Sequence, residues 1–178
     1  VDGSDRGRLP ITEMRNVTTG FFAVTKQRLV AGRLLTAADD ERPETPRVVV
    51  VNEALVKRDF PDRNPIGQRF HMSDTTFATI VGVVSDIRNF GPISDPVPEM
   101  YWNYRQRSPG ASSLDLLIRR RSGEPAAGAA ALRTAVRALD PTAAISQVRP
   151  MTEVISVSLG SPRFYLRLLG AFAVVALV

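Results

Sequence analysis

The segment Arg47-Val48-Val49-Val50-Val51-Asn52 contains four consecutive valines. Valine favours an extended backbone, and an apolar run without polar alternation is typical of a strand that is buried on both faces. Asn52 suits the position before a helix, and Ala54 and Leu55 follow it with helical spacing as far as Phe60-Pro61. We therefore expect a buried strand over residues 47–52 that leads directly into a helix over residues 53–60.

Strand-like and helix-like segments alternate on both sides of this pair, which predicts the α+β class with mixed sheets and packed helices. We expect further strands at residues 11–17, 68–72, 77–84, 99–104, 114–120 and 145–151. Helices are expected at residues 21–24, at 125–139 with Pro125 in its first position, and after a Thr152 cap, ending at Ser161-Pro162.

The remaining segments read as connections. Residues 31–40 are expected to form a loop, in which Thr36 caps a brief helical turn over residues 37–40. Residues 62–67 are rich in turn-forming residues, and residues 91–98 hold three prolines that forbid a helix. Both of these last segments are candidate contact surfaces for a partner, although both are also explained as plain connectors.

Composition indicates an ordinary globular protein, because 44% of the 178 residues are hydrophobic and 23% are charged. This balance excludes wholesale disorder, collagen and a polytopic membrane protein, and the length suits one domain or two small interlocked ones. The net charge of +5 is spread along the chain. The densest cluster, Arg119-Arg120-Arg121, is interpreted as a solvated strand end.

Aromatic residues interleave with arginines between Glu99 and Arg107, as they do in stacking platforms for nucleic acid. A half-buried strand whose Tyr and Trp pack on a sheet is the commoner arrangement and is the one we favour. We therefore expect no nucleic-acid partner.

No motif points to catalysis, to a cofactor or to a metal site. The chain has no cysteine, which excludes disulfides, thiol catalysis and thiolate metal sites. His71 is the single histidine, and it is interpreted as a surface residue of a strand. Phosphate-binding, dinucleotide-binding and nucleophile-elbow motifs are absent from the sequence. A carboxylate dyad formed only by the fold stays open, and the chain is predicted not to be an enzyme.

The final residues are strongly apolar, with no polar side chain from Leu168 to Val178. A membrane-spanning helix needs about 20 apolar residues. We expect residues 163–178 to be the start of a transmembrane helix that continues beyond Val178, with Arg163, Tyr165 and Arg167 at the interface. Residues 1–162 would then form one domain outside the membrane. The alternative is a C-terminal helix buried in the core of a soluble protein.

A series of short motifs resembles, in its order, the MacB-like periplasmic core domain of FtsX-like ABC-transporter permeases. The motifs lie at residues 17–22, 29–33, 48–55, 60–61, 64–70, 80–88, 99–101, 138–141, 151–155 and 162–164. Lys26-Gln27-Arg28 departs from the resemblance, because apolar residues are expected there, and we expect this turn to be exposed. A first transmembrane helix and the first strands of the domain are expected upstream of Val1.

The resemblance implies a domain on the periplasmic side of the bacterial inner membrane, with a porter-like part and a strand-rich part. It implies a permease that pairs with a cytoplasmic ATP-binding ABC subunit or a fused ATPase domain. Such a permease would act as a homodimer or heterodimer, contact a periplasmic adaptor, and convert ATPase-driven motion into periplasmic movement for export or mechanotransmission. The alternative function is an envelope binding or scaffold module that regulates a partner, such as a cell-wall hydrolase, without transport.

Overall fold

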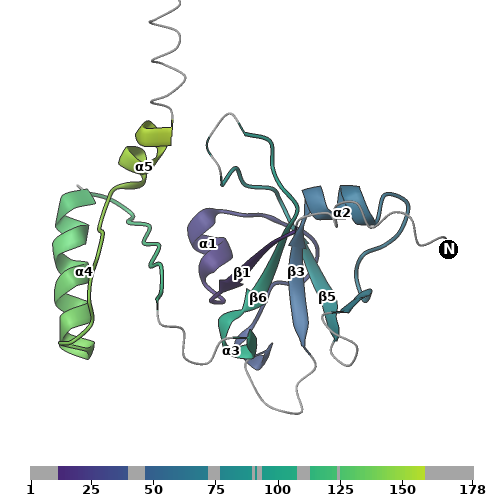
Figure 1. Ribbon diagram of the computed structural model, residues 1–178, viewed down its shortest axis with the longest axis horizontal. Coiled ribbons are helices and arrows are strands. Elements are labelled where there is room, and N and C mark those ends of the chain that lie inside the picture. Colours follow the sequence, from purple (N-terminus) through teal and green to yellow (C-terminus); the bar gives the residue numbers. More distant parts are fainter. Residues whose placement is uncertain are drawn as a thin grey trace, which may run out of the picture. The chain divides into compact units, whose positions relative to one another are not determined.

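The computed structural model describes residues 12–39, 47–71, 77–89, 91, 94–107, 113–123 and 125–158. The chain divides into two compact units (Figure 1). The first unit comprises Val1–Arg88 and Asp95–Ile118, and the second comprises Asn89–Ser94 and Arg119–Val178.

The first unit is built on a six-stranded mixed sheet in the order β1-β6-β3-β5-β2, with β4 pairing with β5 as well. Parallel pairs are β1–β6 and β3–β5, and antiparallel pairs are β3–β6, β2–β5 and β4–β5. The elements are β1 (Glu13–Val17), α1 (Phe21–Thr25), β2 (Leu29–Gly32), the 3-10 helix η1 (Ala37–Asp39), β3 (Val48–Asn52), α2 (Glu53–Asp59), β4 (Arg69–His71), β5 (Phe77–Val84), β6 (Glu99–Asn103) and α3 (Tyr104–Arg107).

The valine strand β3 lies between β6 and β5, and all five of its residues are buried. Its side chains alternate between two apolar clusters on opposite faces of the sheet. Val49 and Val51 pack with Leu55 of α2, whereas Val48 and Val50 pack with Phe22 of α1. Full burial of a valine side chain contributes about 1.5–3 kcal/mol, so this short strand supplies much of the core energy. The predicted two-sided burial is confirmed.

Helix α2 begins at the predicted place because Asn52 caps it. The Asn52 Oδ1 accepts a hydrogen bond of 3.0 Å from the backbone N–H of Leu55. The helix ends at Asp59, before Phe60, whose ring packs edge-on against Phe70 of β4. The strands expected around residues 11–17, 68–72 and 77–84 are likewise present as β1, β4 and β5, and the helix at 21–24 is present as α1.

Strand β6 forms where the sequence predicts a strand, but the expectation of half-burial is wrong. All five residues of β6 are buried, because the strand lies between β1 and β3. Trp102 joins the cluster on the α2 side and Tyr101 the cluster on the α1 side. Neither ring is accessible to a base, so this strand does not form a stacking platform.

The loop expected over residues 31–40 is wrong at its start, where Ala31 and Gly32 belong to strand β2. Gly32 has a φ of +71° and lies opposite Gly82 of β5. A Cβ atom on Gly82 would lie 2.0 Å from the carbonyl oxygen of Arg33. The two glycines therefore permit a backbone approach that any side chain would prevent, and this pairing leaves no apolar pattern in the sequence.

The brief helical turn expected after Thr36 is present as η1, which spans Ala37–Asp39. Thr36 does not cap it as predicted. Its hydroxyl instead donates a 2.9 Å hydrogen bond to Asp39 Oδ2, as does its backbone N–H at 2.8 Å. Asp40 lies outside the described residues.

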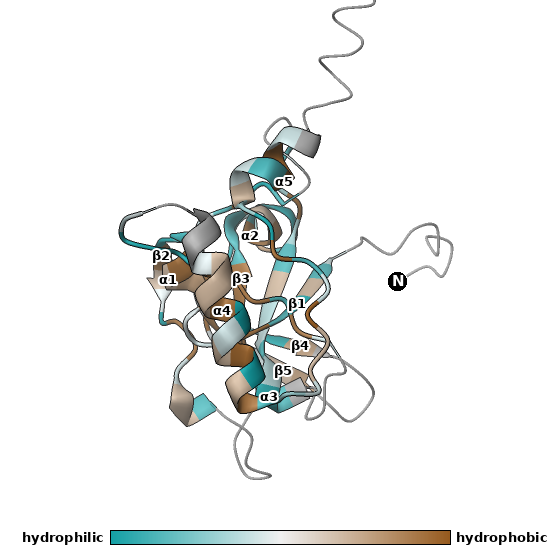
Figure 2. Cartoon of the chain, turned by 90° about the vertical axis from the view of Figure 1, so that its left-hand side faces the viewer, coloured by the Kyte–Doolittle hydropathy of each residue, from teal (hydrophilic) through white to brown (hydrophobic). Residues whose placement is uncertain are grey.

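The second unit contains helices α4 (Pro125–Leu139) and α5 (Met151–Ser158). Helix α4 begins and ends at the predicted residues, with Leu132 and Val136 half-buried, and polar and apolar residues alternate along it in Figure 2. Helix α5 begins one residue before Thr152, so Thr152 lies inside the helix and the predicted cap is wrong. The break expected at Ser161-Pro162 lies outside the described residues.

The strands expected at residues 114–120 and 145–151 are also wrong. Residues 113–120 and 143–150 belong to no strand, and residue 151 starts α5. A strand is defined by hydrogen bonds to a neighbour, and no described strand pairs with either segment. Leu114 is accordingly 69% exposed. The three arginines at 119–121 are exposed as expected, although they do not end a strand.

Within the described parts of the chain, no helix is both long and apolar enough to cross a membrane. The apolar segment at residues 163–178 lies outside these parts, so the transmembrane helix stays a prediction.

The close contact at Gly82 predicts a strong effect of a single methyl group. We expect Gly82→Ala to lower the free energy of unfolding by about 1–3 kcal/mol, because the added Cβ collides with the backbone of Arg33, the residue that follows β2. Gly20→Ala is the matched control, since a Cβ there meets nothing within 4 Å. Urea denaturation followed by circular dichroism measures both, and equal stabilities of the two variants would contradict the account.

Candidate functional site

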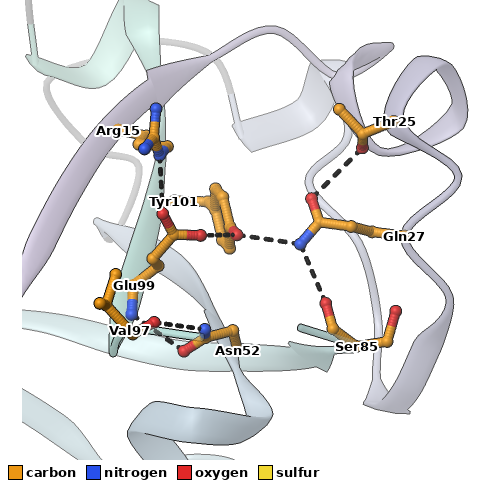
Figure 3. A network of polar contacts seen from close by, with 8 residues as sticks. All are labelled: Arg15, Thr25, Gln27, Asn52, Ser85, Val97, Glu99 and Tyr101. Atoms are coloured by element: carbon orange, nitrogen blue, oxygen red, sulfur yellow. Dashed lines mark hydrogen bonds and ion pairs between the residues drawn. The ribbon is translucent and has the colours of Figure 1, made fainter. Parts of the chain in front are cut away.

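A carboxylate lies buried inside the sheet of the first unit. Glu99 is the first residue of β6 and is fully buried. The Arg15 Nε of the neighbouring strand β1 donates to Glu99 Oε1 at 2.9 Å, and the Tyr101 hydroxyl donates to Oε2 at 2.5 Å (Figure 3). A buried charge without such partners costs several kcal/mol. The ion pair therefore adds a side-chain link to the backbone ladder between β1 and β6.

Gln27 extends this network to the turn after α1 (Figure 3). Its Nε2 donates to the Tyr101 hydroxyl at 2.9 Å and to the Ser85 carbonyl at 3.0 Å, while Thr25 donates to its Oε1 at 3.3 Å. The expectation that the turn Lys26-Gln27-Arg28 is exposed is correct for its two basic residues and wrong for Gln27, which is 6% exposed. The polar residue in an expected apolar position is thus part of the network.

The Tyr101 hydroxyl is held in its protonated form. Burial raises the pKa of Tyr101 far above its ordinary value, and its hydrogen bond to the Glu99 carboxylate raises it further. The hydrogen bond from Gln27 and the charge of Arg15 lower this pKa only in part. Tyr101 therefore donates to Glu99 and accepts from Gln27 at any physiological pH.

Asn52 joins three segments at the end of β3 (Figure 3). Besides capping α2, its Oδ1 accepts from the backbone N–H of Glu99 at 2.9 Å, and its Nδ2 donates to the Val97 carbonyl at 2.8 Å. An asparagine serves here because its amide both donates and accepts. The network and the Asn52 amide together connect β1, β6, β3, the α1–β2 turn and the segment before β6.

The first predicted contact surface, residues 91–98, is anchored at its C-terminal end. Val97 is bonded to Asn52, and the Pro98 carbonyl accepts from the N–H of Glu13 at 2.9 Å. Its described residues form neither helix nor strand, as the prolines predict, and Asp95 is the exposed one among residues 94–98. Contact with a partner stays a prediction.

The second predicted contact surface, residues 62–67, is anchored as well. The Gly67 N–H donates to the carbonyl of Ile80 at 2.8 Å, and Pro65 is buried. Residues 61–64 are exposed, and Asn64 Oδ1 accepts from the N–H of Ile66 at 3.0 Å. Gly67 is exposed as well, and contact of this tip with a partner stays a prediction.

A second polar cluster lies around Asp39. The Arg33 guanidinium donates from Nη1 and Nη2 to the two Asp39 oxygens at 2.7 and 2.8 Å. Burial alone would raise the pKa of Asp39, but the hydrogen bonds from Arg33 and Thr36 outweigh it and hold the pKa below its usual value. Gln106 of α3 accepts from the N–H of Val48 and donates to the Asp39 carbonyl, which attaches η1 to the sheet.

An open pocket of about 320 Å³ lies where β2, α2 and the loop before β4 meet. Its lining is mainly apolar, with Glu53 and Lys57 as its charged members. The lining residues are Val30, Ala31, Glu53, Val56, Lys57, Pro65 and Val83. No motif marks this pocket in the sequence, because its walls come from segments that are distant along the chain.

The described residues hold no group of three or more metal-ligating side chains. His71 lies in β4 as predicted, and its side chain is outside the described part. Both oxygens of Glu99 and both oxygens of Asp39 accept hydrogen bonds. These clusters can hold elements in place, and the pocket can bind an apolar group.

The family model of the MacB-like periplasmic core domain covers residues 2–153. No curated protein matches the chain.

Among solved structures, the chain is similar to the periplasmic region of MacB from Actinobacillus actinomycetemcomitans, with 23% identity over 71% of this chain and 56% of that one, and a TM-score of 0.52. A domain of a putative permease from Porphyromonas gingivalis has 19% identity over 73% of this chain and 55% of that one, with a TM-score of 0.44. The extracellular domain of the noncanonic ABC-type transporter YknZ from Gram-positive bacteria has 17% identity over 51% of this chain and 42% of that one, with a TM-score of 0.38. The likeness to MacB is one of fold, and the chain spans about half the length of these proteins.

The Tyr101 hydroxyl predicts a measurable loss of stability on its removal. We expect Tyr101→Phe to lower the free energy of unfolding by about 1–3 kcal/mol, because Glu99 loses a donor and Gln27 loses an acceptor in a buried place. Tyr104→Phe is the control, since the Tyr104 hydroxyl accepts an exposed hydrogen bond from Arg105. Urea denaturation of both variants checks this, and the account is wrong if the control loses as much stability as Tyr101→Phe.

The Asp39 cluster predicts a pH dependence. Because the folded pKa of Asp39 is lowered, its contribution is complete above the unfolded pKa of about 3.9 and is lost as the pH falls through the folded value. We expect Asp39→Asn to cost about 1–2 kcal/mol at neutral pH, with a gap to the wild type that narrows in acid. Urea denaturation between neutral pH and pH of about 3 measures the gap. The exposed Asp62→Asn is the control, and a gap that stays constant with pH would contradict the assignment.

Proposed function

Because the chain belongs to the family of MacB-like periplasmic core domains, we propose that it is the extracytoplasmic domain of an ABC-transporter permease. In this permease it couples ATPase-driven motion to movement outside the membrane. The observation that carries this proposal is the match of the family model over residues 2–153. The family consists of periplasmic domains of MacB- and FtsX-like permeases. The domain acts by changing position, without catalysis and without a cofactor.

The internal bonding of the first unit supports a mechanical role. A domain that transmits displacement has to resist deformation, and packed interiors transmit strain because they are dense. The central strands β3 and β6 are buried along their whole length. Arg15 of β1 and Gln27 of the α1–β2 turn each add a side-chain hydrogen bond to strand β6. A force applied at either place is therefore passed to the centre of the sheet.

The proposal includes attachment to the membrane. Residues 1–162 form the head, and residues 163–178 start the anchor, since Leu168 to Val178 carry no polar side chain. The head lies on the periplasmic side of the inner membrane. Its partners are a cytoplasmic ATP-binding subunit or a fused ATPase domain, a second permease chain in a homodimer or heterodimer, and a periplasmic adaptor.

Distance measurement in the assembled permease tests the coupling. Residues 1–178 contain no cysteine, so in a permease whose other segments are kept free of cysteine, Arg63→Cys at the exposed tip accepts one spin label per protomer. We expect the label-to-label distance across the dimer to change between the ATP-free and ATP-bound complex, as measured by pulsed electron resonance. Cysteines at Gly20 and Arg63 of one protomer are the control, because both lie in the first unit and their separation is expected to stay constant.

An unchanged distance across the dimer, in a complex that hydrolyses ATP, would count against coupling. It would favour the alternative of a binding or scaffold module that regulates a partner such as a cell-wall hydrolase.

A further inference from the structure

Strand β2 forms an edge of the sheet that no other described strand covers. It is the last strand in the sheet order, and all four of its residues are exposed. Leu29 is 40% exposed and Val30 is 46% exposed. An edge strand presents unpaired backbone N–H and C=O groups, and these are a template for a further strand.

The pocket described above opens beside this edge. Val30 and Ala31 of β2 form one wall, and Val56 and Pro65 belong to the elements that face them. Its volume is at the small end of ligand pockets, which span roughly 300–1,000 Å³, so it suits one or two apolar side chains. A strand added to β2 would bring alternate side chains over the same face of the sheet, and therefore over this pocket.

The charges near the edge of β2 favour one kind of binding partner. Lys26 and Arg28 are exposed just before β2, and Lys57 lines the pocket. Two acidic residues stand against these basic ones. Glu53 is the acidic residue of the described pocket lining, and Asp86 accepts a hydrogen bond from the backbone N–H of Ala54. A second copy of this chain would bring basic residues against basic residues. An acidic segment meets opposite charge instead.

We propose that the outer edge of β2 and the adjoining pocket bind an extended segment of a partner protein in which apolar residues alternate with Asp or Glu. Backbone hydrogen bonds to β2 supply affinity, and the pocket and the basic residues supply specificity. The register shift between Leu29 and Ala31 interrupts the regular ladder, so the site takes a short segment and not a long sheet extension. This binding does not depend on ATP-driven movement, and it goes beyond the function proposed above.

Synthetic peptides of about ten residues test the proposal. The probes alternate Asp with Val, Leu or Phe and carry a fluorophore, and their binding to the full chain is followed by anisotropy. Two matched peptides serve as comparisons: one replaces every Asp by Lys, and the other carries N-methyl groups that remove alternate backbone N–H donors. We expect an acidic peptide to bind, and both comparison peptides to bind at least about tenfold more weakly.

Variants of the chain locate the binding. Val30→Glu places a negative charge at the edge and at the pocket wall, and we expect it to abolish binding of the acidic peptide. Met14→Glu is the control, because Met14 is 52% exposed on the strand at the opposite edge of the sheet. Circular dichroism establishes that both variants keep the fold.

Several results would overturn the proposal. These are no binding by any of the acidic peptides, equal binding by the Lys peptide, or equal loss in the two variants. Self-association of the chain that Val30→Glu removes would identify a second copy as the occupant and would also overturn it. Since no ATPase takes part in this assay, its failure leaves the coupling proposal untouched.

Discussion

The burial of the Glu99 carboxylate is the constraint on which the sheet depends. A charge at the buried start of β6 is tolerable only while its oxygens are bonded, and the donors come from β1 and from Tyr101 of the same strand. Asn52 fixes the backbone N–H of Glu99 from the end of β3. Strand β1 and Tyr101 are thus bonded directly to this buried group, and the α1–β2 turn is linked to it through Gln27 and Tyr101.

The elements predicted correctly are those whose signals are local. Four valines and a capping Asn52 specify β3 and α2 through propensity and capping, which need no knowledge of distant residues. Strand β2 was missed because its pairing depends on a glycine pair and not on an apolar pattern. The segment at 114–120 has the composition of a strand, but it lacks a described neighbour to pair with. Strand content is thus decided by partners that periodicity cannot reveal.

The sequence predicts the family of this chain better than it predicts the polar network and the pocket of the candidate site. The order of the motifs predicts the family, and the match of the family model over residues 2–153 confirms it. The polar network joins Arg15 to Glu99 across 84 positions, and Gln27 reaches Tyr101 across 74. The only sequence signal of this network was the polar residue Gln27 in an expected apolar turn. The role of Gln27 could be recognised only once the position of Tyr101 was known. The pocket beside β2 could likewise be found only from the folded structure.

The parallel pairing of β1 with β6 has a consequence for how the chain reaches its folded state. Among the described strands, Glu13–Val17 pairs with Glu99–Asn103, so the two must meet across a long intervening stretch. Contacts of such separation are slow to form, and an unpaired strand is prone to aggregate while it waits. During synthesis from the N-terminus, β1 lacks its partner β6 until Glu99–Asn103 have been made. Completion of this part of the sheet is therefore late, because the strand at Glu13–Val17 bonds to β6 only after all the residues between them have been synthesised.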